Sequence, residues 1–149
     1  MPSAWRWKKA TPASAVKTAR IAANAPAHGL TGSAEYDDAV RERAVFTAEA
    51  GLAFFHLHAE GMGLVLFFAS TLVAGLVRSR VARRALYTLL TAGALFPLGY
   101  LGYALAVVEL GRDDGVAFAE TWILSQLGTA AIAGLIGLAA ALTRRGETR

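Results

Sequence analysis

Charged residues are absent from three long apolar stretches of the chain. These stretches lie between Glu60 and Arg78, between Arg84 and Glu109, and between Glu120 and Arg144. A helix needs about 20 mostly apolar residues to cross the hydrocarbon of a bilayer. A helix of a soluble bundle would instead show a polar stripe along one side, which these stretches lack. The pattern predicts an all-α integral membrane protein with three transmembrane helices, at about residues 52–77, 85–110 and 116–142.

The first of these helices is predicted to be long and to extend out of the bilayer. Ser33 is a suitable N-cap residue, and acidic residues follow it in the first turn, where the helix dipole favours them. No residue between Tyr36 and Val77 ends the helix decisively. Counting about 20 residues back from Val77 places the edge of the hydrocarbon near His58. The histidines of this helix are therefore expected at one edge of the membrane.

Two features of the other spans concern packing. Pro97 lies in the middle of the second span, where it should kink the helix by freeing the carbonyl of Gly93. In the third span, small residues recur every four positions and predict a ridge for close helix packing. The members of this ridge are Thr129, Ala133, Gly137 and Ala141.

The three-span domain, residues 35–142, is flanked by basic tails at residues 1–34 and 143–149. The N-terminal tail has no acidic residue and no apolar stretch, so it is not a secretory signal peptide. Its "WRWKK" segment combines indole rings and cations as an interfacial anchor does. A mostly extended tail that becomes ordered against a partner is the alternative.

Orientation is predicted from the arginines beside the spans. The loop "RSRVARR" carries Arg78, Arg80, Arg83 and Arg84. Counting positive charges places this loop and the C-terminus in the cytoplasm and the N-terminus outside, in a bacterial inner membrane. The basic residues 1–34 oppose this orientation, but the arginine loop flanks two spans directly and outweighs them. We attribute the net charge of +4 to topology and anionic lipid, with no nucleic-acid partner.

The chain has no cysteine, which excludes disulfides, thiolate metal sites and covalently attached haem. Histidine, carboxylate and methionine remain as ligands. The expected topology gathers polar residues at the outer ends of the three helices. On the first helix these are Glu49, His56, His58 and Glu60, and their possible partners are Tyr103, Glu109, Glu120 and Gln126.

Helical geometry separates the two histidines of the first helix. At about 100° per residue, His56 and His58 point about 200° apart and cannot share one metal ion. His56 shares a face with Glu49 and Glu60, a set that suits a metal cation or a tuned imidazole. His58 shares a face with Met62, which suits copper(I) or the edge of a haem. In the alternative interpretation, both histidines lie in the headgroup zone and form hydrogen bonds with Glu60, Glu109 or Glu120.

The segment "HAEGMGLVLFF", residues 58–68, resembles the helix that supplies a haem axial ligand in the catalytic subunit of haem–copper oxidases. That family has the pattern His-Ala-x-x-Met, followed by an aromatic-rich run. The resemblance implies that His58 is a haem ligand near the outer face and that Met62 is its neighbour. Glu60 departs from the pattern, and no histidine follows His58. The histidines of a binuclear centre are also absent, so oxygen reduction by this chain alone is not expected.

Any second ligand must come from His28, in "APAHGLTG", or from a partner subunit or second copy. The sequence thus predicts a small membrane subunit that holds b-type haem or copper near the outer face, for electron transfer within a larger complex. The alternative is a cofactor-free accessory subunit of a membrane complex. Its partners would be the lipid bilayer and other membrane subunits or a homo-oligomer. No nucleophile–base set, phosphate loop or zinc motif is present, so catalysis by this chain alone is not expected.

Overall fold

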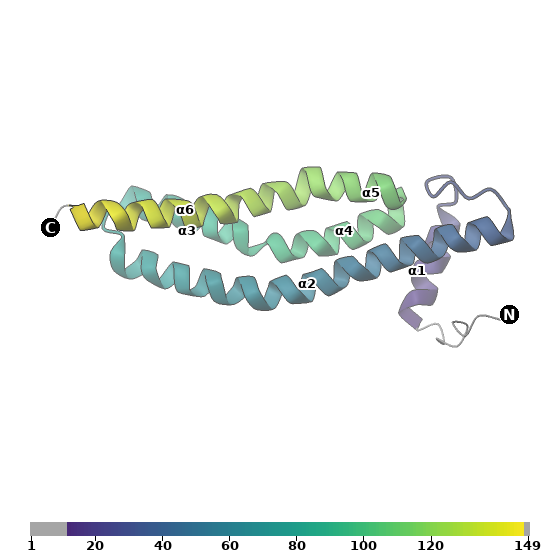
Figure 1. The fold of residues 1–149 in the computed structure, drawn as a ribbon, viewed down its shortest axis with the longest axis horizontal. Helices are drawn as coiled ribbons and strands as arrows, with labels where there is room; N and C mark the ends of the chain where they lie inside the picture. Colours follow the sequence, from purple (N-terminus) through teal and green to yellow (C-terminus); the bar gives the residue numbers. More distant parts are fainter. Residues whose placement is uncertain (1–11, 148–149) are drawn as a thin grey trace.

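A computed structural model describes the backbone of residues 12–147 and the side chains of residues 12–144. The "WRWKK" segment and the last two residues lie outside the described residues. The described chain is helical and contains no strand (Figure 1). The helices are α1 (Pro12–Ala23), α2 (Ala34–Leu76), α3 (Arg80–Ala94), α4 (Phe96–Leu110), α5 (Arg112–Ala119), the π-helix η1 (Glu120–Leu124) and α6 (Ser125–Glu147).

Three helical segments of the described chain are long and apolar enough to cross a membrane: α2, α3 with α4, and α5 with η1 and α6. The 43 residues of α2 span about 65 Å, roughly twice the thickness of the hydrocarbon. This confirms the predicted all-α membrane fold with a long first helix. The loop after α2 and the C-terminus lie at one end of the molecule, and α1 lies at the other (Figure 1).

The second segment lies at the centre of the bundle. On one side α4 and α3 pack along α2, and on the other side α4 packs on α5 and α3 packs on α6 (Figure 1). α3 and α6 approach closely at Gly93, where an added Cβ would lie 2.6 Å from the Cα of Ala131. At Gly51 an added Cβ would lie 2.7 Å from the Tyr103 ring. At these two positions the close approach of the helices leaves no room for a side chain.

The predicted ridge on the third span is only half correct. Gly137 faces Leu86, and Ala141 packs against the core, but Thr129 and Ala133 are exposed. The contact face is instead formed by Gly128, Ala131, Gly134, Gly137 and Leu138. A spacing of four residues drifts around an α-helix. The rotation of α6 toward the bundle is set by the contact of Gly93 of α3 with Ala131. The sequence of the third span alone does not reveal this contact.

Both long segments after α2 are interrupted. At Pro97 the sequence predicted a kink, and the structure shows a break in the helix there: α3 ends at Ala94, and Pro97 stands in the first turn of α4. The sequence did not predict η1, which interrupts the third segment. The hydroxyl of Ser125 donates a hydrogen bond to the carbonyl of Glu120 there. Isolated π-turns inside α-helices occur frequently at functional sites.

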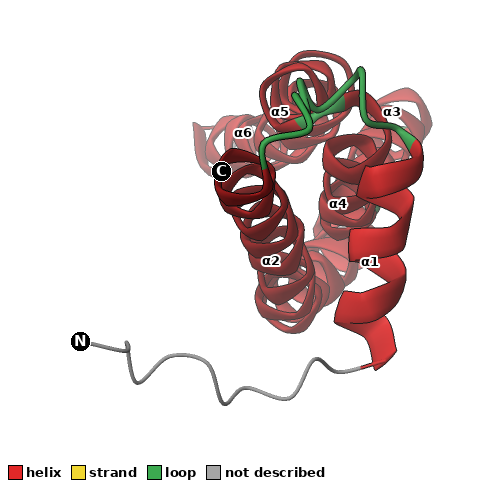
Figure 2. Cartoon of the chain, turned by 90° about the vertical axis from the view of Figure 1, so that its right-hand side faces the viewer, coloured by secondary structure: helices red, strands yellow, loops and turns green. Residues whose placement is uncertain are grey.

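Part of the expected N-terminal tail is helical. α1 lies across α2 and α4, and its Ile21 is fully buried with Ala44, Ala48 and Val107 (Figure 2). The loop that follows leads to α2, which begins at Ala34 as predicted. The side chain of Ser33 makes no capping bond.

The Asp37 carboxylate instead secures the loop before α2. It accepts hydrogen bonds from the backbone N–H groups of Thr31, at 2.8 Å, and Gly32, at 3.0 Å. These bonds, with a smaller contribution from Arg41, outweigh the burial of the group and lower the pKa of Asp37. Asp37 lies in the first turn of α2, well before its membrane-spanning part.

We predict that Gly93→Ala will destabilise the bundle by about 1–3 kcal/mol, because the new methyl group meets the backbone of Ala131 and the helices must move apart. Thermal unfolding in detergent would measure the effect. Gly75→Ala is the matched control, since nothing lies within 4 Å of a Cβ there. Equal effects of the two variants would contradict the proposed register.

We predict that acid will loosen the loop before α2. Because the pKa of Asp37 is lowered in the folded chain, its stabilisation is present above the unfolded value of about 4 and is lost as the pH falls through the folded value. Hydrogen exchange should show protection at Thr31 and Gly32 falling by about tenfold in Asp37→Ala at neutral pH. The variant should also lose the pH dependence, whereas Asp38→Ala should retain it.

Candidate functional site around His58

The His58 ring lies among aromatic side chains of α2 and α4. Its centroid is 4.8 Å from that of Tyr100, 5.4 Å from that of Phe96 and 6.2 Å from that of Phe54. Phe96 also reaches the third segment, because a Cβ added at Gly128 would lie 3.2 Å from its ring. The site therefore lies where all three segments meet, beside the break at Pro97.

His58 lies level with the middle of the uncharged stretch of the second segment, between Arg84 and Glu109. Its neighbour Phe96 is about 18 Å along the helix from Arg84 and about 20 Å from Glu109. This differs from the position at the membrane edge expected from the sequence. That expectation counted residues on the first helix alone, whereas the level of His58 is set by the helix against which it packs.

A single hydrogen bond orients the His58 ring. Its Nδ1 lies 2.8 Å from the carbonyl oxygen of Phe54. A carbonyl can only accept a hydrogen bond, so Nδ1 carries the proton and Nε2 of the neutral ring keeps its lone pair. Histidines that bind metals are typically held in this way by a second hydrogen bond through the other ring nitrogen.

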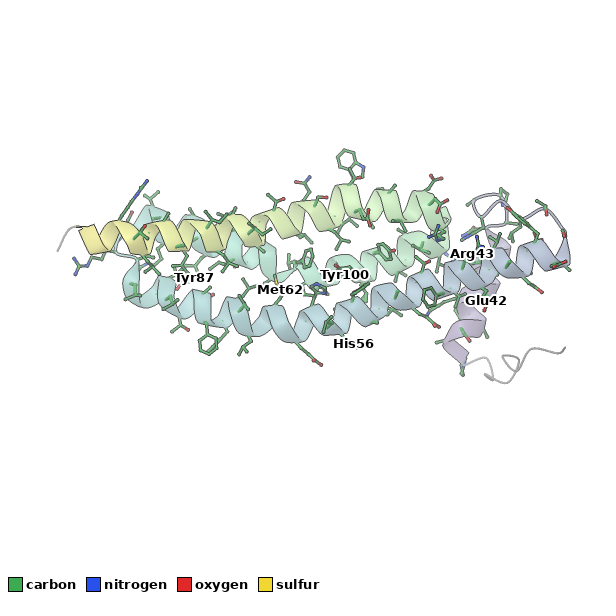
Figure 3. All side chains as sticks on the ribbon, in the orientation of Figure 1. Glu42, Arg43, His56, Met62, Tyr87 and Tyr100 are labelled. Atoms are coloured by element: carbon green, nitrogen blue, oxygen red, sulfur yellow. The ribbon has the colours of Figure 1, made fainter. Side chains whose placement is uncertain are left out.

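Met62 follows His58 by one helical turn, as expected. Its partly buried side chain packs against the core cluster that includes Leu66 and Val73. In Figure 3, Met62 and Tyr100 are directed into the space between α2 and the second segment. The His58 ring and the thioether thus belong to the inner side of α2.

The predicted metal set of His56, Glu60 and Glu49 is not brought together. His56 and Glu60 are both exposed, and His56 points away from α4 (Figure 3). Glu49 instead lies 3.5 Å from Lys17 of α1. Among the residues that the structure describes, no group of three histidine, aspartate or glutamate side chains could hold a metal ion.

His28 is not brought to His58 either. It is buried in the loop before α2, and its Nε2 donates a 2.8 Å hydrogen bond to the carbonyl of Val108, in the last turn of α4. Val108 is about 12 Å along α4 from Tyr100, which contacts His58. His28 therefore binds a carbonyl at the C-terminal end of α4. The backbone of the same loop packs on Gly111, whose φ is +93°.

The acidic and polar residues that were expected as partners of the histidines contact other groups or are exposed. Glu109 accepts hydrogen bonds from Arg20, at 2.7 Å, and Asn24, at 3.0 Å. Tyr103 packs on Gly51, whereas Glu120 and Gln126 are exposed. The described histidines form no hydrogen bond with these groups, and the two inner ones bond backbone carbonyls.

Sequence reasoning identified His58 but missed the aromatic wall around it. Phe54 precedes His58 by one turn, and Phe96 and Tyr100 flank Pro97. The aromatic residues close to Pro97 in the second span were the signal in the sequence that could have indicated this wall. Which helix would face them depends on the register between helices, which a linear pattern does not contain.

No protein family, curated protein or solved structure matches this chain. The chemistry of the site is therefore inferred from its own residues. One imidazole with a free Nε2 can supply one ligand to a metal or haem iron. A complete coordination shell would need a ligand from another chain.

Proposed function

We propose that the chain is a small membrane subunit in which His58 supplies one ligand to a redox cofactor, b-type haem or copper, for electron transfer within a larger complex. The main support for this proposal is the hydrogen bond from Nδ1 of His58 to the Phe54 carbonyl, which leaves Nε2 of His58 free to bind a metal. An ionisable side chain inside a membrane bundle has a functional role by default.

The surroundings of His58 suit both cofactors. The rings of Phe54, Phe96 and Tyr100 form an apolar wall of the kind that a haem requires. Met62 is a soft neighbour of the kind that copper(I) prefers. Either group would supply one-electron chemistry, and this chain's part would be to hold and orient the His58 imidazole. The second ligand would come from a partner subunit or a second copy.

The second candidate function is a cofactor-free accessory subunit. The outward position of His56 and Glu60 on α2, at about the level of Phe96, supports its need for partner subunits, a need that the first function shares. Ionisable groups at membrane depth almost always face protein rather than lipid. These two side chains therefore require a covering partner, whether or not a cofactor is bound.

For both functions we propose a bacterial inner membrane, with α1 outside and the arginine loop in the cytoplasm. Arginines in short loops beside spans favour the cytoplasmic side. The loop after α2 and the C-terminus lie at the same end of the bundle, which is consistent with this orientation (Figure 1).

We predict that the detergent-purified full chain, expressed with haem and copper available, will show a reducible Soret band or bound copper. His58→Ala should lose at least about 90% of this signal, because the ligand would be removed. His56→Ala is the matched control and should retain it, since His56 points away from the site. Optical spectra and metal analysis give both readouts.

A purified chain without this signal is followed up as the complex, because a partner subunit would supply the second ligand there. The same measurements are therefore made on the complex captured from native membranes in mild detergent. A complex without haem or copper would reject the cofactor and leave the accessory function. A cofactor that persists in His58→Ala at full occupancy would reject His58 as the ligand.

A further inference from the structure

The outer surface of α2 has a polar patch in an otherwise apolar stripe. We propose that this surface binds α2 of a second copy of the chain, with each His56 contacting Glu60 of the other copy. We call it the His56 face and define it by His56, Glu60, Gly63 and Phe67. This inference goes beyond the proposed function, because the His56 face points away from His58.

Neither polar side chain of the His56 face is satisfied within one copy. In the described part of the chain, no hydrogen bond or ion pair involves the His56 ring or the Glu60 carboxylate, and the only aromatic ring that pairs with His56 is that of Phe55. Their neighbours are apolar and open: Leu57 is 64% exposed, Leu64 61% and Phe67 67%. Only a lipid or another protein can cover this surface.

The depth of the patch favours protein as the cover. His56 and Glu60 flank His58 along α2, and His58 packs beside Phe96 at the middle of the uncharged stretch of the second segment. A carboxylate that faces lipid at this depth lacks any hydrogen-bond donor. Such groups normally pair with one another or face a protein interior.

A second copy satisfies both groups without any other protein. The two side chains are four residues apart, so they lie on adjacent turns, about 6 Å from each other. Both side chains lean toward the N-terminus of the helix, so this offset of about one turn is kept and the contact between copies runs diagonally, from His56 of one copy to Glu60 of the other. Copies inserted in the same direction are related by a two-fold axis along the membrane normal. Each histidine then meets the carboxylate of the other copy, as an isologous interface requires.

The His56 face also allows two helices to approach closely. Gly63 lies on it, and Gly61 lies beside it. Nothing is within 4 Å of a Cβ added at either position. Small residues are enriched where membrane helices pack together. The complementary polar pair, placed at the same level in both copies, adds the directional contact that the glycines alone do not provide.

Cross-linking of the full chain in liposomes tests the contact. Because the chain has no cysteine, single cysteines report on single positions. Gly63→Cys lies on the His56 face, and Ile136→Cys, on an exposed position of α6, is the control. With the purified protein in phosphatidylethanolamine–phosphatidylglycerol vesicles, a short bis-maleimide should yield at least about fivefold more dimer from Gly63→Cys. Equal yields would overturn the proposal.

Energy transfer between labelled copies tests the polar contact itself. Diluting the protein in the same vesicles gives the dimer affinity, and Glu60→Ala or His56→Glu should weaken it by about tenfold. The exchanged variant, His56→Glu with Glu60→His, should recover to within about threefold, because each copy again offers both groups. Circular dichroism checks that all variants remain helical.

Two outcomes would overturn the second copy as occupant. One is a wild-type chain that remains monomeric at all protein-to-lipid ratios. The other is a dimer whose affinity does not respond to the single substitutions. These readouts need no cofactor, and His58→Ala should leave the dimer unchanged. Failure of this inference is therefore distinguishable from failure of the proposed function.

Discussion

The register between the second segment and its two neighbours determines where every polar group of the bundle lies. It is set by close contacts at glycines, among them Gly93 on the backbone of Ala131, Gly115 on the backbone of Ala106 and Gly51 on the Tyr103 ring. Membrane helices gain little from the hydrophobic effect when they associate, so close packing of small residues carries much of the association. Once these contacts align the helices, His58 must lie beside Phe96 and the break at Pro97.

The two histidines of α2 have different environments because they point to opposite sides of one helix. His58 packs between aromatic rings and bonds a backbone carbonyl, whereas His56 is exposed on the outer surface. In water this difference would have little consequence. In a membrane polar groups find no solvent partner, and this is why we propose a cofactor for the inner histidine and a protein partner for the outer one.

The end of the bundle that carries α1 is held by charged and polar contacts of another kind. Arg20 and Asn24 bond Glu109, and His28 bonds the carbonyl of Val108. These contacts engage the C-terminal turn of α4, where helix carbonyls lack partners within the helix. The basic N-terminal residues and the acids of α2 and α4 were visible in the sequence, but their pairing depends on how α1 crosses the bundle.

The sequence alone determined the fold class, the three apolar segments, the long first helix and a distortion of the second span at Pro97. These features follow from local composition and backbone chemistry, which hydrocarbon length and proline geometry constrain directly. The separation of His56 from His58 also followed from helical periodicity. Only the tertiary structure decided the position of His58 along the bundle, its aromatic neighbours, the separation of His28 from His58 and the packing face of α6. Each of these depends on the register between helices, and that register arises from contacts between residues far apart in the chain.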